Sequence, residues 1–372
     1  MNRSTPTDVA SMPTGLDDLR REITLTDREI LALLNRRARL CREVGRVKSA
    51  SDQAVFKPFR EKEVLEGLVA ENPGDLPDDH LRTIYREILS SSRRLQQPQK
   101  AVYLGPEGTF SYFAGLELLG SSTDFEPCAN LEAVFAAVSG KKADLGIVPL
   151  ENSLSGSAGQ NLDLFLRYEA HIQAEIYLRI SHHLVGAGNT LAGIHTVYSH
   201  PRAIDQCAAW LNSHLPGAHV VFVQSTAAAA REAAGRPDCA AVGHKKLAAM
   251  FSLNLLAGPI EDAPDNWTRF IVIGHQVPAG GSRDKTSILF TLPDKSGALV
   301  NVLSVLARGG INLKKLESRP MRSEKWQYLF FADLECDLSD KEYADLQAEL
   351  AENCHTLRVL GSYPAGLHLN DC

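Results

Sequence analysis

The chain has 372 residues, of which 44% are hydrophobic and 23% charged, and its formal net charge is −6 at pH 7. This length predicts two or three domains, and the composition excludes a disordered or collagen-like chain. The acidity argues against general nucleic-acid binding, which needs a basic face. No stretch is apolar enough to cross a membrane and the first residues lack a signal peptide's apolar core, so we expect a cytoplasmic protein.

Residues 16–48 have the three-and-four spacing of apolar residues that predicts one long amphipathic helix. About 33 residues would make a helix roughly 50 Å long, too long for one small domain to cover. Further helical patterns at 60–71 and 78–96 are separated by the break at 72–75 (NPGD). Three helices without strands form part of a bundle, which a second copy of the chain would complete, so we expect at least a dimer.

The long helix carries a cluster of cations in its second half. At 100° per residue, Arg37 and Lys48 fall within the apolar stripe. Arg39, Arg42 and Arg46 fall on the opposite face, where a solvated charged surface explains them. Charges on a buried seam need a counter-charge. Either acidic side chains of the following helices neutralise Arg37 and Lys48, or an anionic ligand does.

Arg20 lies at the edge of the same stripe, about 25 Å from Arg37 along the helix axis. It cannot easily reach the ligand of Arg37 in its own chain, but in a paired bundle it could reach the partner's. At this point the sequence resembles a known family. The segment LRREITLTDREILALLNRRARLCREVGRVK, with Phe59-Arg60-Glu61 and Ser91-Ser92 through Gln96, closely resembles the all-helical chorismate mutases.

This resemblance implies an interlocked dimer that rearranges chorismate to prephenate. It implies that Arg37 and Arg20 of the partner subunit hold the two substrate carboxylates. It also implies that Lys48 and Gln96 hydrogen-bond the ether oxygen. The other substrate-binding residues that it implies are Lys57, Arg60, Glu61 and Ser92. The reaction needs no nucleophile and no proton transfer, so binding a compact conformer and stabilising the charge on the ether oxygen are what count.

From residue 101 to about 278, short apolar runs alternate with helical ones, as in an α/β domain with room for two lobes and a cleft. The strand candidates are 101–105, 143–150, 175–185, 195–199, 220–224, 239–243 and 269–274. The segment 105–111 (GPEGTFS) lacks the Gly-Lys-Ser/Thr ending of a phosphate loop, so a structural turn explains it better.

Four polar stretches of this segment are informative as a set: 148–153, 199–201, 206–207 and 266–270. Each alone fits a helix cap or turn, but in this order they resemble prephenate dehydratase. The resemblance implies that Thr268 assists departure of the ring hydroxyl, by hydrogen bonding or proton delivery. The substrate-contacting residues that it implies are Asn152, Ser153, Ser199, Gln206, Thr268, Arg269 and Phe270.

After a turn-rich segment at 278–284, the last segment has the βαββαβ order of a ferredoxin-like module. Gly297-Ala298-Leu299-Val300 begins its first helix, and Glu317-Ser318-Arg319-Pro320 ends a strand. Because this segment follows a dehydratase-like one, the two tetrapeptides resemble motifs of the ACT domain, in which paired modules bind phenylalanine. The resemblance therefore implies that these residues bind an effector whose binding is reciprocally coupled to the catalytic site.

Metal and cofactor sites are not expected. The seven cysteines are scattered and include no Cys-x-x-Cys pair, which indicates free thiols. His182 and His183 have no second ligand pair beside them, and neighbours on a strand point to opposite faces.

We therefore predict three domains: a helical chorismate mutase over 1–98, with its core at about 16–97, a two-lobed α/β prephenate dehydratase over 99–278, and an α+β, ferredoxin-like ACT domain over 285–365. The predicted function is a bifunctional enzyme that makes phenylpyruvate from chorismate and is inhibited by L-phenylalanine. Two alternatives stay open: a dehydratase that uses arogenate, and a non-catalytic amino-acid sensor. A sensor has no use for a mutase pocket, so the joint presence of the mutase residues argues against the second.

Overall fold

The computed structural model describes residues 15–49, 55–154, 156–157, 160–278, 283–321, 328–366 and 368–369. Most of the predicted turn at 278–284 therefore lies outside the described residues. The described chain forms two compact units. One unit holds the residues up to Val55 together with Leu95–Gln97, and the other holds Phe56–Arg94 and the residues from Pro98 onward.

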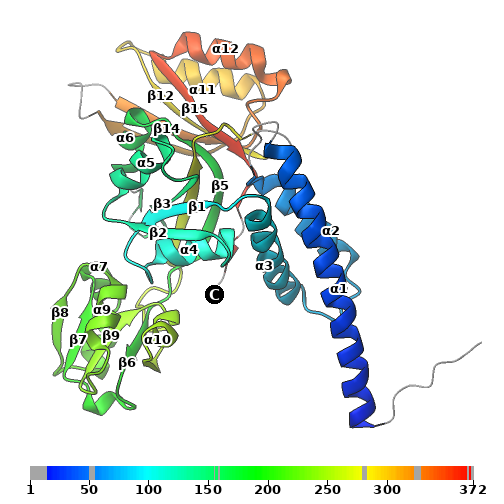
Figure 1. The fold of residues 1–372 in the computed structure, drawn as a ribbon. Coiled ribbons are helices and arrows are strands. Elements are labelled where there is room, and N and C mark those ends of the chain that lie inside the picture. The colour runs from blue at the N-terminus through cyan, green and yellow to red at the C-terminus, as the bar shows by residue number, and fades with distance from the viewer. Residues whose placement is uncertain are drawn as a thin grey trace, which may run out of the picture. The chain divides into compact units, whose positions relative to one another are not determined.

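The N-terminal segment is helical, as the sequence predicts (Figure 1). Its helices are α1 (Leu16–Ser49), α2 (Pro58–Glu71) and α3 (Asp78–Gln96). Pro58 starts α2 two residues before the predicted boundary, because its fixed φ suits the first turn of a helix. In the break between α2 and α3, Gly74 adopts a φ of +102°, a conformation that favours glycine.

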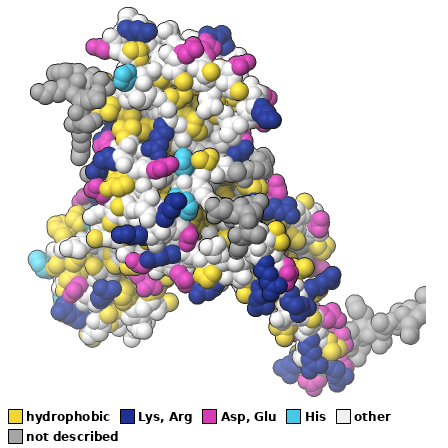
Figure 2. Space-filling model, turned by 45° about the horizontal axis from the view of Figure 1, so that its top comes forward, with side chains coloured by type: hydrophobic (Ala, Val, Ile, Leu, Met, Phe, Trp, Pro, Cys, Tyr) yellow, Lys and Arg dark blue, Asp and Glu magenta, His cyan; other side chains and the backbone are white. Residues whose placement is uncertain are grey.

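Apolar side chains of the predicted stripe on α1 are exposed among the described residues. Ile23 is 60% exposed and Leu33 62% exposed. Around the first turns, Asp17 and Asp18 pair with Arg20 and Arg21. Figure 2 shows charged side chains of both signs crowding the end of α1 next to the grey segment. The helix thus has a charged surface, and apolar side chains of its predicted stripe are exposed among the described residues.

The first α/β lobe is built on a seven-stranded sheet in the order β16-β5-β11-β3-β1-β2, with β4 paired to β3. Its strands are β1 (Lys100–Leu104), β2 (Asp124–Cys128), β3 (Leu145–Asn152), β4 (Gly156–Ser157), β5 (His171–Arg179), β11 (Trp267–Gly274) and β16 (His368–Leu369). Its helices are α4 (Phe110–Leu119), α5 (Leu131–Ser139) and α6 (Gln160–Arg167). The late strand β11 lies antiparallel between β3 and β5, and this pairing places Thr268 opposite Asn152.

The second lobe has a five-stranded sheet in the order β10-β6-β9-β7-β8. Its strands are β6 (His183–Gly186), β7 (Thr196–Ser199), β8 (His219–Phe222), β9 (Cys239–Gly243) and β10 (Asn254–Ala257). Its helices are η1 (Leu191–Gly193), α7 (Pro201–Gln206), α8 (Ala208–His214), α9 (Thr226–Ala233) and α10 (Lys246–Met250).

The prediction of a single strand at 175–185 is wrong, because this run is divided between β5 of the first sheet and β6 of the second. The crossover residues Ile180, Ser181 and His182 are buried like the strands on either side. The apolar pattern therefore continues through the connection. His182 lies in this crossover and not in a strand.

The C-terminal domain has the predicted βαββαβ order, with sheet order β13-β14-β12-β15. Its elements are β12 (Lys285–Thr291), α11 (Ala298–Arg308), β13 (Leu313–Pro320), β14 (Tyr328–Leu334), η2 (Lys341–Tyr343), α12 (Ala344–Asn353) and β15 (Thr356–Tyr363). Helices α11 and α12 cover one face of the sheet (Figure 1). On the other face, Phe331 and Leu360 share a hydrophobic core with Ile271 and Phe165 of the first lobe.

No helix within the described ranges is long and apolar enough to span a membrane.

Candidate active sites

A cavity of about 690 Å³ opens between the two α/β lobes. The first lobe contributes the ends of β3 and β11 and the turn from β1 into α4. The second lobe contributes α7 and the start of α9. A cleft of this size with a few convergent polar groups is the usual form of a small-molecule site.

Asn152, Asn266 and Thr268 form a hydrogen-bonded set in the cavity wall. Asn152 Nδ2 donates to Asn266 Oδ1 at 2.6 Å and to Thr268 Oγ1 at 2.9 Å. The Thr268 hydroxyl hydrogen can therefore point to another acceptor, such as a ligand oxygen. Asn266 is 1% exposed, and its Nδ2 has no hydrogen-bond partner among the described residues. Two donors, the hydroxyl of Thr268 and the amide of Asn266, are thus available in the first lobe.

Gln206 faces the cavity from the second lobe, where it ends α7. Its Oε1 lies 2.8 Å from His182 Nε2. An amide oxygen can only accept, so the imidazole donates from Nε2 and the amide nitrogen of Gln206 stays available as a donor. His182 is itself held in place, because its backbone N–H donates to Glu261 Oε2 at 2.9 Å and its ring packs edge-on against Phe110.

Several sequence-predicted residues are absent from the cavity lining formed by the described residues. Ser199 is buried and its Oγ donates to the carbonyl oxygen of Val242 at 2.7 Å. Ser153 Oγ accepts from the backbone N–H of Trp267 at 2.9 Å. Both serines thus bond to backbone, whereas Phe270 does line the cavity.

Other lining residues were not predicted. They are Glu151, Asn161, His182, Arg202 and Asn266, among others. Glu151 and Asn266 stand inside two of the stretches that identified the dehydratase, so the signal was present in the sequence. The sequence pattern raises for His182 only the role of a metal ligand, which is not expected. Among the described residues, no cluster of three His, Cys, Asp or Glu side chains could hold a metal ion.

Two histidines near the cavity are held neutral. Burial, aided by the charge of Lys246, lowers the pKa of His244 to about 3. Burial and the neighbouring Arg202 lower the pKa of His200. Neither imidazole carries charge at neutral pH, whereas the guanidinium of Arg202, which lines the same part of the wall, is cationic.

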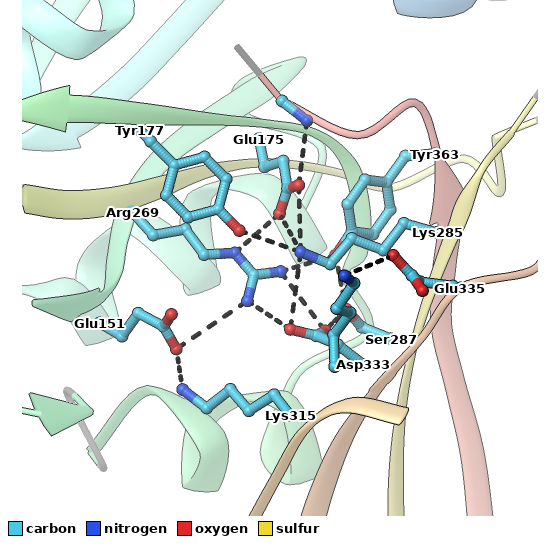
Figure 3. A network of polar contacts seen from close by, with 12 residues as sticks. Glu151, Glu175, Tyr177, Arg269, Lys285, Ser287, Lys315, Asp333, Glu335 and Tyr363 are labelled. Carbon is cyan, nitrogen blue, oxygen red and sulfur yellow. Dashed lines mark hydrogen bonds and ion pairs between the residues drawn. The ribbon is translucent and has the colours of Figure 1, made fainter. Parts of the chain in front are cut away.

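Arg269 points away from the cavity, into a buried polar network between the first lobe and the C-terminal domain (Figure 3). Its Nε donates to Glu175 Oε2 at 2.7 Å, and its two terminal nitrogens donate to Asp333 and to the hydroxyl of Tyr363. Burial would lower the pKa of Arg269, yet the surrounding acidic groups raise it. Lys285 Nζ also donates to Glu175, at 3.0 Å. The strand that presents Thr268 to the cavity is thus fixed to the C-terminal domain through the next residue.

The first compact unit holds four of the predicted mutase residues: Arg20, Arg37, Lys48 and Gln96. Arg37 and Lys48 are half-buried, with Arg37 Nη1 3.8 Å from Cys41 Sγ and Lys48 Nζ 3.3 Å from the carbonyl oxygen of Val55. Gly45 lets the backbone of Gln96 approach α1, because a Cβ at position 45 would lie 2.7 Å from the Gln96 carbonyl oxygen. Arg20 is exposed and pairs with Asp17.

The remaining predicted mutase residues lie in the second unit. Glu61 forms an ion pair with the buried Arg93, and Arg60 pairs with Glu63 at 3.0 Å on the surface. Ser92 Oγ donates to the carbonyl oxygen of Ile88 at 2.5 Å. Lys57 is the residue that precedes α2.

The two predicted effector tetrapeptides lie at element ends. Gly297 precedes α11 with a φ of +81°, which favours glycine, and Ala298 is buried at the start of that helix. Residues 317–320 end β13, where Arg319 donates to Asp163 Oδ2 of α6 at 2.8 Å. The second tetrapeptide is therefore joined to the first lobe.

The fold and the cavity define a class: a multidomain protein with a helical segment, a two-lobed α/β catalytic domain and a ferredoxin-like domain. Residues 19–97 match the family of type II chorismate mutases, residues 101–278 match prephenate dehydratase, and residues 286–351 match the ACT domain.

The chain is 41% identical to the bifunctional chorismate mutase/prephenate dehydratase of Aquifex aeolicus, over 95% of this chain and 98% of that protein. It is 32% identical to that of Escherichia coli K12, over 93% and 95% respectively. Among solved structures, prephenate dehydratase from Arthrobacter aurescens in complex with L-Phe is 34% identical, with a TM-score of 0.65 and coverage of 71% of this chain and 90% of that one.

The chain belongs to the family of bifunctional chorismate mutase/prephenate dehydratases. It is an enzyme of phenylalanine biosynthesis, so the alternative of a non-catalytic sensor is wrong.

Proposed function

We propose that the cavity between the two lobes is the site where prephenate loses CO₂ and water to give phenylpyruvate. The observation that carries this assignment is the hydrogen-bonded set of Asn152, Asn266 and Thr268 in the cavity wall. The ring becomes aromatic in this step, so the driving force lies in the substrate. The protein needs to orient the ring and help the hydroxyl to leave.

In this assignment Thr268 acts on the leaving hydroxyl. Asn152 occupies a lone pair of Thr268 Oγ1, which turns the hydroxyl hydrogen toward the substrate. The Gln206 amide and Arg202 supply donors for the substrate carboxylates from the second lobe. Substrate binding thus uses both lobes.

We propose that the helical segment rearranges chorismate to prephenate. Arg37 holds a substrate carboxylate, and Lys48 and Gln96 donate to the ether oxygen whose bond to the ring breaks. The approach of Gln96 to α1 at Gly45 supports this assignment, since it brings the residue before the linker to the same end of the helix as Lys48.

We also propose that the chain works as a homodimer in the cytoplasm, with L-phenylalanine as its inhibitor. The exposure of apolar side chains on α1 supports a dimer, because a second copy of this helix would bury them. The free cysteines among the described residues support a reducing compartment. The match to the ACT domain and the L-Phe complex of the Arthrobacter dehydratase support the inhibitor.

The two-site assignment is tested by supplying chorismate or prephenate separately to the purified chain. Arg37→Ala should abolish prephenate formation and leave added prephenate convertible, whereas Thr268→Ala should do the reverse. Arg39→Ala, on the exposed face of the same helix, is the matched control and should retain both activities. If either variant loses both steps while still folded, the assignment is wrong. Arogenate, supplied in parallel, identifies the preferred dehydratase substrate.

The dimer is tested by mixing two inactive variants, Arg20→Ala and Arg37→Ala. A hybrid dimer would contain one mutase site with Arg37 from one chain and Arg20 from the other, both intact. Since half of the dimers in a random mixture are hybrids with one intact site in two, about a quarter of the wild-type mutase rate should return. If no mutase activity returns on mixing, the two chains do not share their mutase sites.

A further inference from the structure

Strand β13 presents alternate side chains to the first lobe. Lys315, Glu317 and Arg319 are partly buried, whereas Leu316 and Ser318 between them, and Lys314 before them, are exposed. This is the period-two pattern of a strand packed on one face. Glu317 and Arg319 belong to the predicted effector tetrapeptide, so Lys315 shares its face with that segment.

Lys315 is shared between two carboxylates. Its Nζ pairs with Glu151 Oε2, as Figure 3 shows, and also lies 3.4 Å from Glu317 Oε2. Glu151 lines the cavity and immediately precedes Asn152. One ammonium group of the C-terminal domain thus lies between a carboxylate of the dehydratase cavity and a carboxylate of the effector tetrapeptide.

The charge of Glu151 depends mainly on this lysine for compensation. The second cation nearby is Arg269, whose Nη1 is 3.9 Å from Glu151 Oε2 and is already bound to Asp333. Without Lys315, Glu151 would leave an uncompensated negative charge in the wall of a cavity that receives an anionic substrate. Like charges at this range oppose binding.

We propose that Lys315 is a positioning residue of the dehydratase step, supplied by the C-terminal domain, and that its sharing between Glu151 and Glu317 links the effector segment to the cavity. An amino acid whose ammonium group binds Glu317 competes with Lys315 for that carboxylate. Lys315 then pairs with Glu151 alone and draws it, together with Asn152, away from the arrangement that binds substrate. The inference deepens the proposed function and rests on it.

The test uses the full chain with added prephenate. Lys315→Met keeps the length of the side chain and removes the charge. We expect it to raise KM for prephenate about tenfold, with a smaller change in kcat, because the loss is one of charge compensation. L-Phenylalanine should still bind, as measured by calorimetry without substrate, but should inhibit the dehydratase much less. The mutase rate should stay unchanged.

Two further variants separate positioning from a structural role. Lys315→Arg retains the cation and should restore KM and inhibition in large part. Lys314→Met is the matched control from the same strand, because Lys314 is 57% exposed and pairs with Glu335 at 2.9 Å on the other face. It should behave as the wild type.

The inference is overturned if Lys315→Met leaves both KM and inhibition unchanged. It is also overturned if Lys314→Met has the same effect. A third contrary result would be that Lys315→Met loses effector binding as well as activity and that Lys315→Arg restores neither. A wild-type chain that converts no prephenate would instead refute the proposed function itself.

Discussion

Replacing Arg269 by methionine should destabilise the unit formed by the α/β lobes and the C-terminal domain. The guanidinium is 1% exposed and compensates two carboxylates, Glu175 and Asp333, that are as deeply buried. In the variant, Lys285 would be the one cation among the described residues that pairs with both carboxylates. Removing one partner of a buried ion pair costs about 3–5 kcal/mol, because the remaining charge stays buried. For a unit of roughly 300 residues, with an unfolding entropy of about 0.6 kcal/mol/K, we expect the melting temperature to fall by roughly 5–8 °C.

The pH dependence of this loss is a sharper signature. Burial acts to raise the pKa of Asp333, but Arg269 and Lys285 lower it below its ordinary value. Such a carboxyl contributes stability that is complete above its ordinary pKa and is lost as the pH falls through the folded value. The variant lacks most of this contribution. The difference in melting temperature between wild type and variant should therefore be constant from pH 7 down to about pH 4 and narrow only below that.

The control is Arg167→Met, which removes an arginine from an ion pair with Glu132 whose partners are 55% and 49% exposed. Exposed pairs contribute about 1 kcal/mol or less, so this variant should melt within a few degrees of the wild type. Equal melting temperatures for the two variants at pH 7, or a gap that widens on acidification, would refute the reasoning about Arg269.

Two other variants probe single positions. Gly45→Ala should lower the mutase rate at least about tenfold and spare the dehydratase, because its Cβ would lie 2.7 Å from the Gln96 carbonyl oxygen; Gly67→Ala, which meets nothing within 4 Å, is the control, and equal mutase rates would contradict the prediction. His244→Gln should make the free energy of unfolding fall less steeply as the pH is lowered. The pKa of His244 is about 3 in the folded chain, so the unfolded chain alone takes up this proton between pH 6.5 and 3. The wild type then loses up to about 1.4 kcal/mol per pH unit over that range. Urea unfolding at pH 7 and 5 measures the free energy of unfolding of both proteins. An equal loss between the two pH values in wild type and variant would count against the prediction.

Periodicity predicted the helical segment well, because a long amphipathic pattern is a strong local signal. The predicted helix at 16–48 and the observed Leu16–Ser49 differ by one residue at the end. The prediction failed where a segment is buried without being a strand, or is a strand without being buried. The apolar run at 175–185 continues through a buried crossover, and β2, with the sequence DFEPC and a largely exposed surface, carries little apolar pattern.

The chemistry-bearing stretches were visible in the sequence, but the direction of their side chains was not. Asn152 and Thr268 come from two such stretches, and the antiparallel pairing of β3 with β11 brings them together. Arg269, next to Thr268, points to the opposite face and into the network with the C-terminal domain. Alternation along a strand says that neighbours diverge, but not which of them faces a cavity.

The sequence by itself thus determined the order of the three domains, the long amphipathic helix, and the stretches that carry the chemistry. These are properties of local pattern and composition. Only the tertiary structure decided that His182 supports Gln206, and that Lys315 of the C-terminal domain reaches Glu151 in the cavity wall. Lys315 and Glu151 are 164 residues apart in the chain. Contacts of this kind depend on how separate sheets pack, and no spacing within one segment can reveal them.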